Sequence, residues 1–306
     1  MDVSSEFIRR TAFDAGFSLC GIARCRPLAE RSGALESWLD GGLHSGMEYM
    51  ERNREKRLDP GLLVEGARTV VVCAVNYKNT AWNQTAEGRS PKIASYSYAP
   101  DYHTLIKQML ARMLERIAAE YPGVGGRCFS DTAPVLEKSW ASEAGLGWTG
   151  RNSLLITPQY GSFVLLGELM LNAECDSYDE PYAKDGCGSC TRCMDACPNG
   201  AIVSPRVIDT GRCIARLTNE RMPEGVEIPS GMLHGWLSGC DECQSCCPYN
   251  QKTPLFSNPS FAPVVNPAAT TPQFWRSLTG AGFLRIFGST PLKRTGYEAI
   301  KSRIPE

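Results

Sequence analysis

The sequence predicts an α+β protein in two parts, followed by a C-terminal arm. Helical and strand periodicities alternate over residues 1–175, which indicates a domain built on a mixed sheet. Nine of the 14 cysteines lie in residues 176–255, which indicates a small second domain organised by its cysteines. Residues 256–306 are rich in Pro, Asn and Thr and predict an extended arm that ends in the basic segment 291–303.

Each element of the first domain follows from a local pattern. Residues 69–77 (TVVVCAVNY) are β-branched and apolar, and predict a buried strand. The polar stretch 78–91 predicts an exposed loop. Residues 102–120 repeat apolar side chains at helical spacing, and the buried face consists of Ile106, Leu110, Met113 and Ile117. Further helices are expected at residues 4–16 and 134–144, and further strands at residues 18–23, 127–130, 153–156 and 162–171.

The first cysteine run matches a known metal-cluster spacing. Cys187, Cys190, Cys193 and Cys197 are separated by two, two and three residues, and Pro198 follows them. This is the bacterial ferredoxin pattern that binds iron–sulfur clusters, in which the fourth cysteine of a run ligates the other cluster. The chain is therefore expected to be a redox protein.

A second run repeats the first imperfectly, and the two align on their Cys-Pro pairs. Leu237 stands where the first ligand of the second run is needed, and Cys213 is the obvious replacement. Cys246 aligns with Ala196 and competes with Cys247, which is favoured by its spacing and its proline. One [4Fe–4S] cluster is therefore assigned to Cys187, Cys190, Cys193 and Cys247, and the other to Cys197, Cys213, Cys240 and Cys243.

Disulfides and structural zinc are the alternatives for these cysteines. Fourteen cysteines without an apolar leader sequence argue against a secreted, disulfide-bonded protein. Zinc sites use paired Cys-x-x-Cys motifs, but they do not require a third cysteine at the next spacing or a Cys-Pro after it. The remaining cysteines have no ligand spacing and are expected to be small buried side chains: Cys20, Cys25, Cys73, Cys128 and Cys175.

Composition excludes several classes of function. A net charge of −1 and a pI near 6.4 exclude a uniformly basic nucleic-acid coat but allow a local basic face. No apolar run is long enough to span a membrane, so a soluble, cytoplasmic protein is expected. Neither a Gly-x-Gly-x-x-Gly after a strand nor a P-loop is present. Because two clusters only carry electrons, a second redox partner is expected near them.

Several ordered motifs closely resemble those of epoxyqueuosine reductases. They are residues 130–137 (SDTAPVLE), 144–153 (AGLGWTGRNS), 161–163 (GSF) and 166–168 (LGE). The same resemblance is carried by Asp101-Tyr102-His103, the first cysteine run, and Gly239-Cys240-Asp241 with Cys243-Gln244, and it extends to about residue 303. Members of this family use cobalamin and two [4Fe–4S] clusters to reduce epoxyqueuosine at the wobble position of tRNA to queuosine, the last step of queuosine synthesis.

The resemblance implies a fold and a mechanism. The family's catalytic domain binds cobalamin and resembles nitroreductase and cobalamin-processing folds, and a two-cluster ferredoxin-like domain follows it. The clusters would deliver electrons singly to the cobalt, and Co(I) would attack an epoxide carbon or otherwise reduce the ring. The protein supplies geometry and a proton.

Asp131 matches the family's proton donor. From the residues alone, Asp131 is a turn or helix-capping carboxylate ahead of Pro134. A general acid that works near neutral pH needs a raised pKa, and burial beside the corrin ring is expected to raise the pKa of Asp131.

Three other residues are placed near the corrin by the resemblance, and His103 is not one of them. Arg54, in the basic run 52–57, would pair with amide or phosphate groups of cobalamin, or else lies on a solvated helix face. Asn152 would bind the carboxamide fringe, or else is a turn residue that begins a strand. Ala215 would pass its backbone near the corrin. His103 is expected to be a pocket-wall or core histidine, because the resemblance implies no protein histidine below the cobalt.

Basic residues near the C-terminus are the candidates for contacts to tRNA phosphates. They are Arg221, Arg285, Lys293 and Arg294, with Lys301 and Arg303 behind them. An ordinary solvated basic tail is the alternative. Many family members continue into helical repeats that grip the tRNA, whereas this chain stops at Glu306, which predicts weaker tRNA binding or help from a partner.

Three functions compete. Epoxyqueuosine reductase is favoured, as a monomer that receives electrons from an unidentified donor. A corrinoid iron–sulfur reductase of a small molecule, like reductive dehalogenases, would fit the short C-terminus and the near-neutral charge. A non-catalytic electron carrier needs only the cluster segment, so the long first domain with Asp131 counts against it. Cobalamin retention distinguishes the carrier from the enzymes, and salt-sensitive tRNA binding distinguishes the two enzymes.

Overall fold

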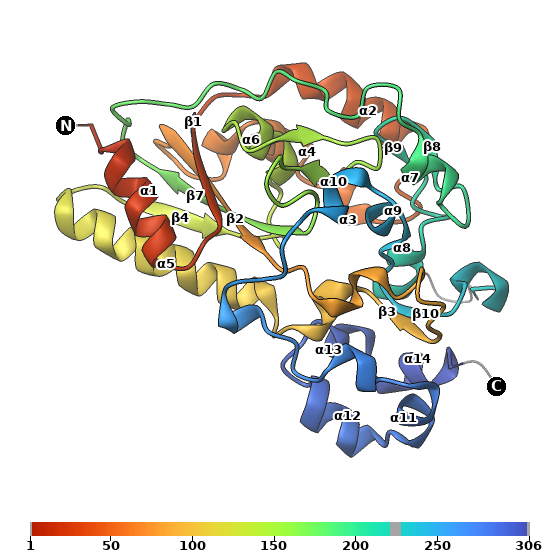
Figure 1. Ribbon diagram of the computed structural model, residues 1–306. Helices are drawn as coiled ribbons and strands as arrows, with labels where there is room; N and C mark the ends of the chain where they lie inside the picture. The colour runs from red at the N-terminus through yellow and green to blue at the C-terminus, as the bar shows by residue number, and fades with distance from the viewer. Residues whose placement is uncertain (1, 221–227, 305–306) are drawn as a thin grey trace.

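A four-stranded sheet in the order β1-β2-β7-β4 forms the centre of the molecule, as the computed structural model shows for residues 2–220 and 228–304 (Figure 1). Every neighbouring pair of strands is antiparallel. The sequence predicted a mixed sheet, but this sheet is entirely antiparallel. The strand β2 lies inside the sheet and is buried along its whole length, as its β-branched sequence predicts. The strands are β1 (Leu19–Arg24), β2 (Thr69–Asn76), β4 (Gly126–Phe129) and β7 (Val164–Leu171).

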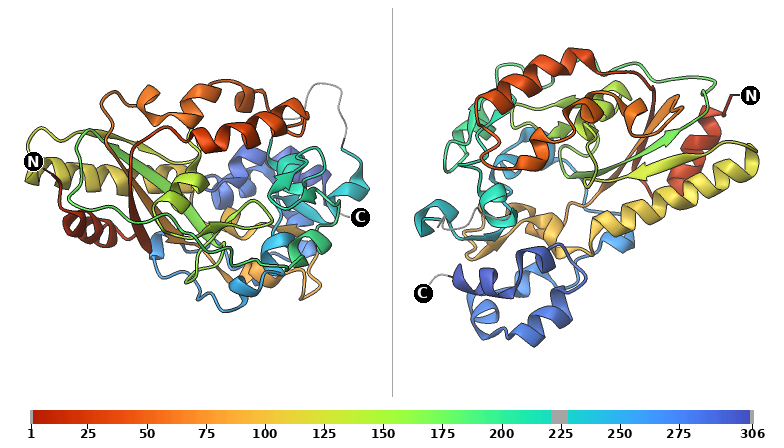
Figure 2. Two further views of the ribbon diagram at one scale, coloured as in Figure 1. Left: turned by 90° about the horizontal axis from the view of Figure 1, so that it is seen from above. Right: turned by 180° about the vertical axis from the view of Figure 1, so that it is seen from behind.

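Helices α1 (Ser5–Asp14) and α5 (Tyr102–Glu120) lie side by side on one face of this sheet (Figures 1 and 2). The predicted apolar stripe of α5 is fully buried there, in one core with Ile8, Ile22 and Leu169. Gly167 of β7 permits this contact, because a Cβ at that position would lie 2.3 Å from Ile106 Cγ2. The sequence pattern therefore correctly predicted both helices and the buried face of α5.

The other face of the sheet is covered by α6 (Glu137–Glu143), which buries Trp140 against Val72 and Met170. This helix begins three residues later than the expected start at Pro134, because residues 130–136 form a turn. The remaining elements before the cysteine runs are α2 (Ser32–Asp40), α3 (Glu48–Glu51), α4 (Arg54–Leu58), β3 (Lys92–Ile93), β5 (Trp148–Thr149) and β6 (Leu155–Ile156). Strand β6 pairs only with β5, so the expected strand near residue 153 belongs to a separate hairpin.

The cysteine-rich domain lies at one end of the sheet and is joined to the first domain by backbone pairing. Strand β10 pairs in parallel with β3, and Lys92 N donates to Gly235 O at 2.7 Å. The elements of this domain are α7 (Arg192–Asp195), β8 (Ile202–Ser204), β9 (Val207–Ile208), α8 (Ile214–Asn219), β10 (Trp236–Ser238), α9 (Glu242–Ser245) and α10 (Pro248–Gln251).

The polar stretch 78–91 is only in part the exposed loop that its composition predicts, since residues 86–88 are exposed but other polar residues are not. Lys78, Asn79 and Gln84 are buried. The Lys78 ammonium donates to Asn250 O at 2.7 Å and to Thr253 O at 2.8 Å, and lies 4.0 Å from the centre of the Trp82 ring. These contacts tie the start of the stretch to the chain that leaves the second cysteine run.

The expected extended arm is irregular apart from two short 3-10 turns as far as residue 271, but residues 272–302 form a small helical unit, drawn in blue in Figure 1. Proline and threonine begin its helices: Thr271 caps α11 and Pro272 is its first residue, and Thr279 caps α12. The composition of residues 256–306 predicted an extended arm because proline and threonine, which begin these helices, are frequent in it. The unit packs Trp275 and Phe287 against Leu237 and Tyr98 in one apolar core. Its helices are α11 (Pro272–Ser277), α12 (Gly280–Phe287), α13 (Leu292–Thr295) and α14 (Tyr297–Ser302). Within the described residues, no helix is long and apolar enough to cross a membrane.

Candidate active site and cluster ligands

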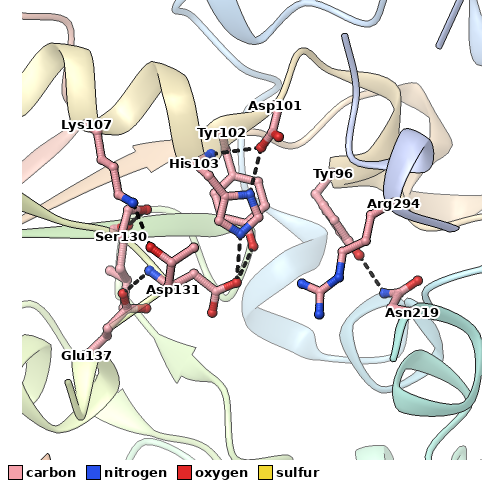
Figure 3. A network of polar contacts seen from close by, with 12 residues as sticks. Tyr96, Asp101, Tyr102, His103, Lys107, Ser130, Asp131, Glu137, Asn219 and Arg294 are labelled. Atoms are coloured by element: carbon pink, nitrogen blue, oxygen red, sulfur yellow. Dashed lines mark hydrogen bonds and ion pairs between the residues drawn. The ribbon is translucent and has the colours of Figure 1, made fainter. Parts of the chain in front are cut away.

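Asp131 lies just beyond the C-terminal end of β4, in a turn that presents its carboxylate to the side chains of α5 (Figure 3). Its backbone has φ of 58°, in the left-handed region that L residues seldom adopt. The Tyr102 hydroxyl donates to Asp131 Oδ2 at 2.8 Å, and His103 Nε2 lies 3.0 Å from the same oxygen. The Asp131 side chain is 52% exposed, so its carboxylate can reach a bound molecule.

His103 lies between two carboxylates and is not the pocket-wall or core histidine that we expected. Its Nδ1 lies 2.6 Å from Asp101 Oδ1, opposite the contact with Asp131. Asp101 also caps α5 by accepting from His103 N at 3.0 Å, and the Tyr102 ring stacks on the imidazole at 4.0 Å. Ionised carboxylates only accept hydrogen bonds, so the ring satisfies both when both of its nitrogens carry protons.

These contacts also determine where the proton lies. Burial lowers the pKa of His103, but the hydrogen bonds to Asp131 and Asp101 outweigh it, and the pKa is raised overall. The His103 hydrogen bond lowers the pKa of Asp131, and burial opposes this effect without reversing it. These contacts therefore lower the pKa of Asp131, because the imidazolium stabilises the carboxylate, and the rise expected from burial beside the corrin ring stays a prediction. The two side chains act as one site that holds a proton on the histidine.

Two further carboxyl groups lie behind Asp131. Its backbone N–H donates to Glu137 Oε1, at the start of α6. Burial and the charge of Asp131 raise the pKa of Glu137 to about 7, and burial together with Glu137 raises that of Glu168. A cavity of about 210 Å³ opens beside them and is lined by Tyr102, Asp131, Glu137, Lys138, Ser162 and five apolar residues.

Polar groups from α8, α13 and the segment before α5 lie close to this site. Figure 3 draws Arg294 and the Tyr96–Asn219 pair beside His103 and Asp131, and Asn219 Nδ2 donates to Tyr96 Oη at 2.6 Å. Arg294 pairs with Glu220 at 3.0 Å, remains 60% exposed, and contributes to lowering the pKa of Asp131. A cation is thus held within electrostatic reach of the carboxylate.

The thiols assigned to the first cluster interact with one another. Burial raises the pKa of Cys193, and the charges of Cys187 and Cys247 raise it further. Burial likewise raises the pKa of Cys247, with contributions from Cys187 and Cys190. All four cysteines are therefore within electrostatic range of one another, although two of them are separated by 60 residues in sequence.

The second assigned set behaves in the same way. Burial raises the pKa of Cys213, with a contribution from Cys197, and raises that of Cys240, with a contribution from Cys213. Cys243 interacts with Cys240 and Cys213, and also with Cys193 of the first set. The two sets therefore lie side by side.

Backbone geometry supports the alignment of the two runs. The residues before α7 and α9 have nearly the same angles, with φ −113° and ψ 3° at Thr191 and φ −111° and ψ 9° at Asp241. Ala196 and Cys246 also match, at φ −81° and ψ −9°. The Cys246 thiol donates to Cys243 O at 3.6 Å, and burial raises its pKa to about 12. Cys246 thus has the backbone angles of Ala196, but the charges of Cys193, Cys247 and Cys190 also help to raise its pKa, so the assignment of Cys247 in preference to Cys246 stays a prediction.

Hydrogen-bond donors point at two of the assigned ligands. Trp148 Nε1 donates to Cys187 Sγ at 3.3 Å, and Ala201 N donates to Cys197 Sγ at 3.2 Å. Such N–H groups stabilise thiolates that bind iron. Among the described residues, no three His, Cys, Asp or Glu side chains gather around a position for a single metal ion. A four-iron cluster, in contrast, occupies the space between its cysteines.

The residues that were expected to bind cobalamin are dispersed. Arg54 begins α4, is half exposed and lies 4.0 Å from Asp40. Asn152 is buried, and its amide donates to Cys243 O and accepts from Leu154 N, both at 3.3 Å. Ala215 lies in the first turn of α8, and its N–H lowers the pKa of Cys213 against the larger effect of burial. Asn152 and Ala215 therefore lie beside the second cysteine set.

The basic residues proposed for tRNA fall into two groups. Arg285 and Lys293 are exposed on α12 and α13, beside Arg294. Arg303 instead donates to Thr218 O at 3.1 Å and Leu237 O at 2.8 Å, and Lys301 donates to Arg276 O at 2.5 Å. The last turn of the chain is thus attached to the protein and is not a free basic tail. Arg221 lies outside the described residues.

Sequence reasoning did not assign roles to Tyr102, Glu137, Glu168 or Tyr49. Burial is the main cause that raises the pKa of Tyr49, and the charges of Glu220 and Asp131 raise it further. The Tyr49 ring therefore lies near the site. Tyr102 and Glu137 belong to motifs that the sequence analysis singled out. Tyr102 is next to His103, and Glu137 follows Asp131 by six residues. Their presence in those motifs was the signal that would have identified them.

Comparison with known proteins agrees with this site. Residues 57–132 match a family model described as epoxyqueuosine reductase QueG, DUF1730, and residues 186–250 match a 4Fe-4S double cluster binding domain. The epoxyqueuosine reductase of Cellulophaga algicola is 40% identical over 98% of this chain and 96% of its own length. The chain belongs to the epoxyqueuosine reductase family. The epoxyqueuosine reductase of Cyclobacterium marinum is also 40% identical, over 98% of this chain and 95% of its own.

Solved epoxyqueuosine reductases have the same fold. One, in complex with an epoxyqueuosine-modified stem loop of tyrosine tRNA, has a TM-score of 0.83 and 27% identity, covering 98% of this chain and 79% of the other. The Bacillus subtilis enzyme has a TM-score of 0.81 and 26% identity over the same shares, and was observed with its catalytic aspartate loop swung out of the active site. The chain is therefore an oxidoreductase whose family uses cobalamin and two [4Fe–4S] clusters.

Proposed function

We propose that this epoxyqueuosine reductase converts epoxyqueuosine in tRNA to queuosine, with Asp131 and His103 as its proton-transfer site. The observation that carries the proposal is the hydrogen-bonded row Asp101–His103–Asp131, whose last carboxylate is half exposed beside a cavity. Cobalamin supplies the reducing cobalt centre when it is bound. The two cysteine sets are the proposed ligands of the clusters that feed it with electrons.

The proton needed by the departing epoxide oxygen comes from this row. Asp131 Oδ2 receives a proton from His103 Nε2, and the Asp131 carboxyl passes it to the substrate oxygen. Asp101 holds the imidazole in place through Nδ1, so that Nε2 points at Asp131. Because its pKa is raised, His103 retains its proton to a higher pH than an ordinary histidine does and can supply it over a wider pH range.

The cofactor and domain assignments follow from the same arrangement. Residues 1–175 are the proposed cobalamin-binding domain and residues 176–255 the cluster domain. Asn152 and Ala215, beside the second cysteine set, would face the corrin, and Asn152 keeps one amide hydrogen available for it. Arg54 remains a proposed contact at the edge of the site.

The tRNA is proposed to lie across the helical unit. Arg285, Lys293 and Arg294 offer exposed cations there, and Arg294 adjoins the Asp131 site. Phosphate contacts of this kind provide affinity and register. We infer a cytoplasmic monomer that receives electrons from a separate donor protein.

The decisive experiment is turnover. Reconstituted protein with both clusters and cobalamin is incubated anaerobically with a one-electron reductant and epoxyqueuosine-containing tRNA, and the digested nucleosides are analysed by mass spectrometry. Queuosine should appear as epoxyqueuosine disappears. No conversion by fully loaded protein would contradict the proposal and favour a corrinoid reductase of a small molecule.

A further inference from the structure

We propose that Glu137 and Glu168 form a carboxyl–carboxylate pair with one shared proton, and that this pair positions the turn that carries Asp131. The inference rests on the proposed role of Asp131. Both glutamates are positioning residues, because the hydrogen bond of Glu137 goes to the backbone N–H of Asp131 and not to its carboxylate. Their effect reaches the reaction through the backbone of the turn.

Glu168 is an unusual residue for its location. It lies in β7, is fully buried, and belongs to the sheet face that also holds Leu166 and Met170. Neither of its carboxylate oxygens receives a hydrogen bond from a donor within the described residues. An ionised carboxylate without a donor is strongly unfavourable in such a place. A proton on Glu168 removes this charge and provides the missing hydrogen bond, with Glu137 as the acceptor.

The position of the shared proton follows from the other partner of Glu137. The Asp131 backbone N–H can only donate, so Glu137 Oε1 must accept. The side chains of Glu137 and Glu168 interact with each other, and two adjoining carboxyl groups do not both ionise. Burial raises the pKa of both groups, and the interaction with Glu137 raises that of Glu168 further. Glu168 therefore holds the proton and donates it to Glu137, which accepts from Asp131 as well.

The turn needs this support. Asp131 adopts a left-handed backbone conformation that is unfavourable for a residue with a side chain. Ser130 is held by its hydroxyl, which donates to Leu166 O at 2.9 Å, and Thr132 by the Lys107 ammonium at 2.6 Å. The backbone of Asp131 itself is held through Glu137. If that hydrogen bond is lost, the turn can leave the position in which His103 contacts its carboxylate.

Other titratable groups face the pair from each neighbouring element. They are Asp131 from the turn, Lys138 from α6 and Tyr102 from α5, while Cys73 of β2 interacts with Glu168 from the opposite face of the sheet. The charge of Asp131 disfavours ionisation of the pair and the charge of Lys138 favours it. These two opposed charges shift the pKa of the pair without supplying a hydrogen bond. No other group among the described residues donates to Glu168.

The test compares substitutions that keep or remove the hydrogen bonds. In cofactor-free protein, amide hydrogen exchange at Asp131 is measured for the wild type, Glu168→Gln, Glu168→Met and Glu137→Leu. Gln can donate to Glu137 in place of the carboxyl group, whereas Met and Leu cannot. We expect exchange at Asp131 to accelerate at least tenfold in Glu168→Met and Glu137→Leu, and to stay near the wild-type rate in Glu168→Gln.

Turnover then separates positioning from chemistry. kcat should fall at least tenfold in Glu168→Met with KM for tRNA unchanged, and Glu168→Gln should restore most of the loss. Unchanged exchange in both Glu168→Met and Glu137→Leu would overturn the proposal, as would Glu168→Gln behaving like Glu168→Met. Should Glu168→Met fail to fold, Glu137→Leu gives the same reading from a position at the helix start. Because exchange is measured without cofactors, it remains decisive even if the wild type does not reduce epoxyqueuosine.

Discussion

His103 Nε2 lies 3.0 Å from Asp131 Oδ2 while its Nδ1 lies 2.6 Å from Asp101 Oδ1, so one imidazole bridges two carboxylates. The pairing raises the pKa of the histidine and lowers that of Asp131. The proton donation that we propose for this site therefore belongs to the pair and not to Asp131 alone.

Asp131→Asn should leave the clusters and bound cobalamin intact and abolish most turnover. General acid catalysis contributes about 10²–10⁴-fold, and an amide cannot pass on the proton of His103. The measurement is queuosine formation under single-turnover conditions, with iron content and the cobalamin spectrum as controls. An active variant would remove Asp131 from the mechanism.

The His103–Asp131 pair should determine the pH dependence of turnover. The raised pKa of His103 keeps its proton on the imidazole below and somewhat above the ordinary value of about 6.5. Activity should therefore be retained at pH 6.5 and decline as the pH rises through the raised value. His103→Gln should lose this alkaline decline and reduce kcat about 10–100-fold. An unchanged pH profile in that variant would show that another group donates the proton.

Glu168→Gln should change stability in a pH-dependent way. The pKa of Glu168 is raised in the folded state, so the unfolded chain releases this proton first as the pH increases above about 4.5. In the wild type, the contribution of Glu168 to the free energy of unfolding is present below about pH 4.5 and is lost as the pH rises toward the pKa of Glu168 in the folded state. The glutamine variant does not lose stability in this way, because its amide does not ionise. Urea unfolding of cofactor-free protein should show it gaining about 1–3 kcal/mol relative to wild type between pH 5 and pH 8. A difference that is independent of pH would place the proton elsewhere.

Cys247→Ser and Cys246→Ser should differ in metal content. Both cysteines lie within electrostatic range of the first set, but Cys246 has the backbone angles of Ala196, which has no thiol in the first run, and Cys247 precedes the proline as Cys197 does. Loss of Cys247 should reduce iron from about eight to about four atoms per chain, and loss of Cys246 should leave about eight. Iron analysis and electron paramagnetic resonance of anaerobically reconstituted protein test this. Equal losses would mean that the two cysteines share the role.

Arg294→Ala and Lys293→Ala should weaken tRNA binding without affecting the clusters. Each removed phosphate contact should reduce the slope of log affinity against log salt by about 1. Arg116, which pairs with Asp14 at the far end of α5, provides a matched control substitution. If Arg116→Ala weakens binding as much as Arg294→Ala, the helical unit is not the tRNA surface.

The sequence predicted the elements that depend on local patterns and missed those that depend on distant partners. The β2 strand and the apolar stripe of α5 were predicted because their side chains follow local sequence patterns. The cysteine runs were identified from the spacing of their cysteines alone. The bridging role of His103 was missed because its second carboxylate comes from residue 131, across a turn. Lys78 was assigned to an exposed loop because its carbonyl partners lie more than 170 residues away.

Lys78 has a consequence for how the protein can be divided. Its ammonium is buried beneath carbonyls of residues 250 and 253, which follow the second cysteine run. A fragment containing only the cluster region would expose those carbonyls. A fragment without the cluster region would leave the Lys78 ammonium without its carbonyl partners. The two parts are therefore poor candidates for transplantation as independent modules. Chimeras of this enzyme should exchange both parts together.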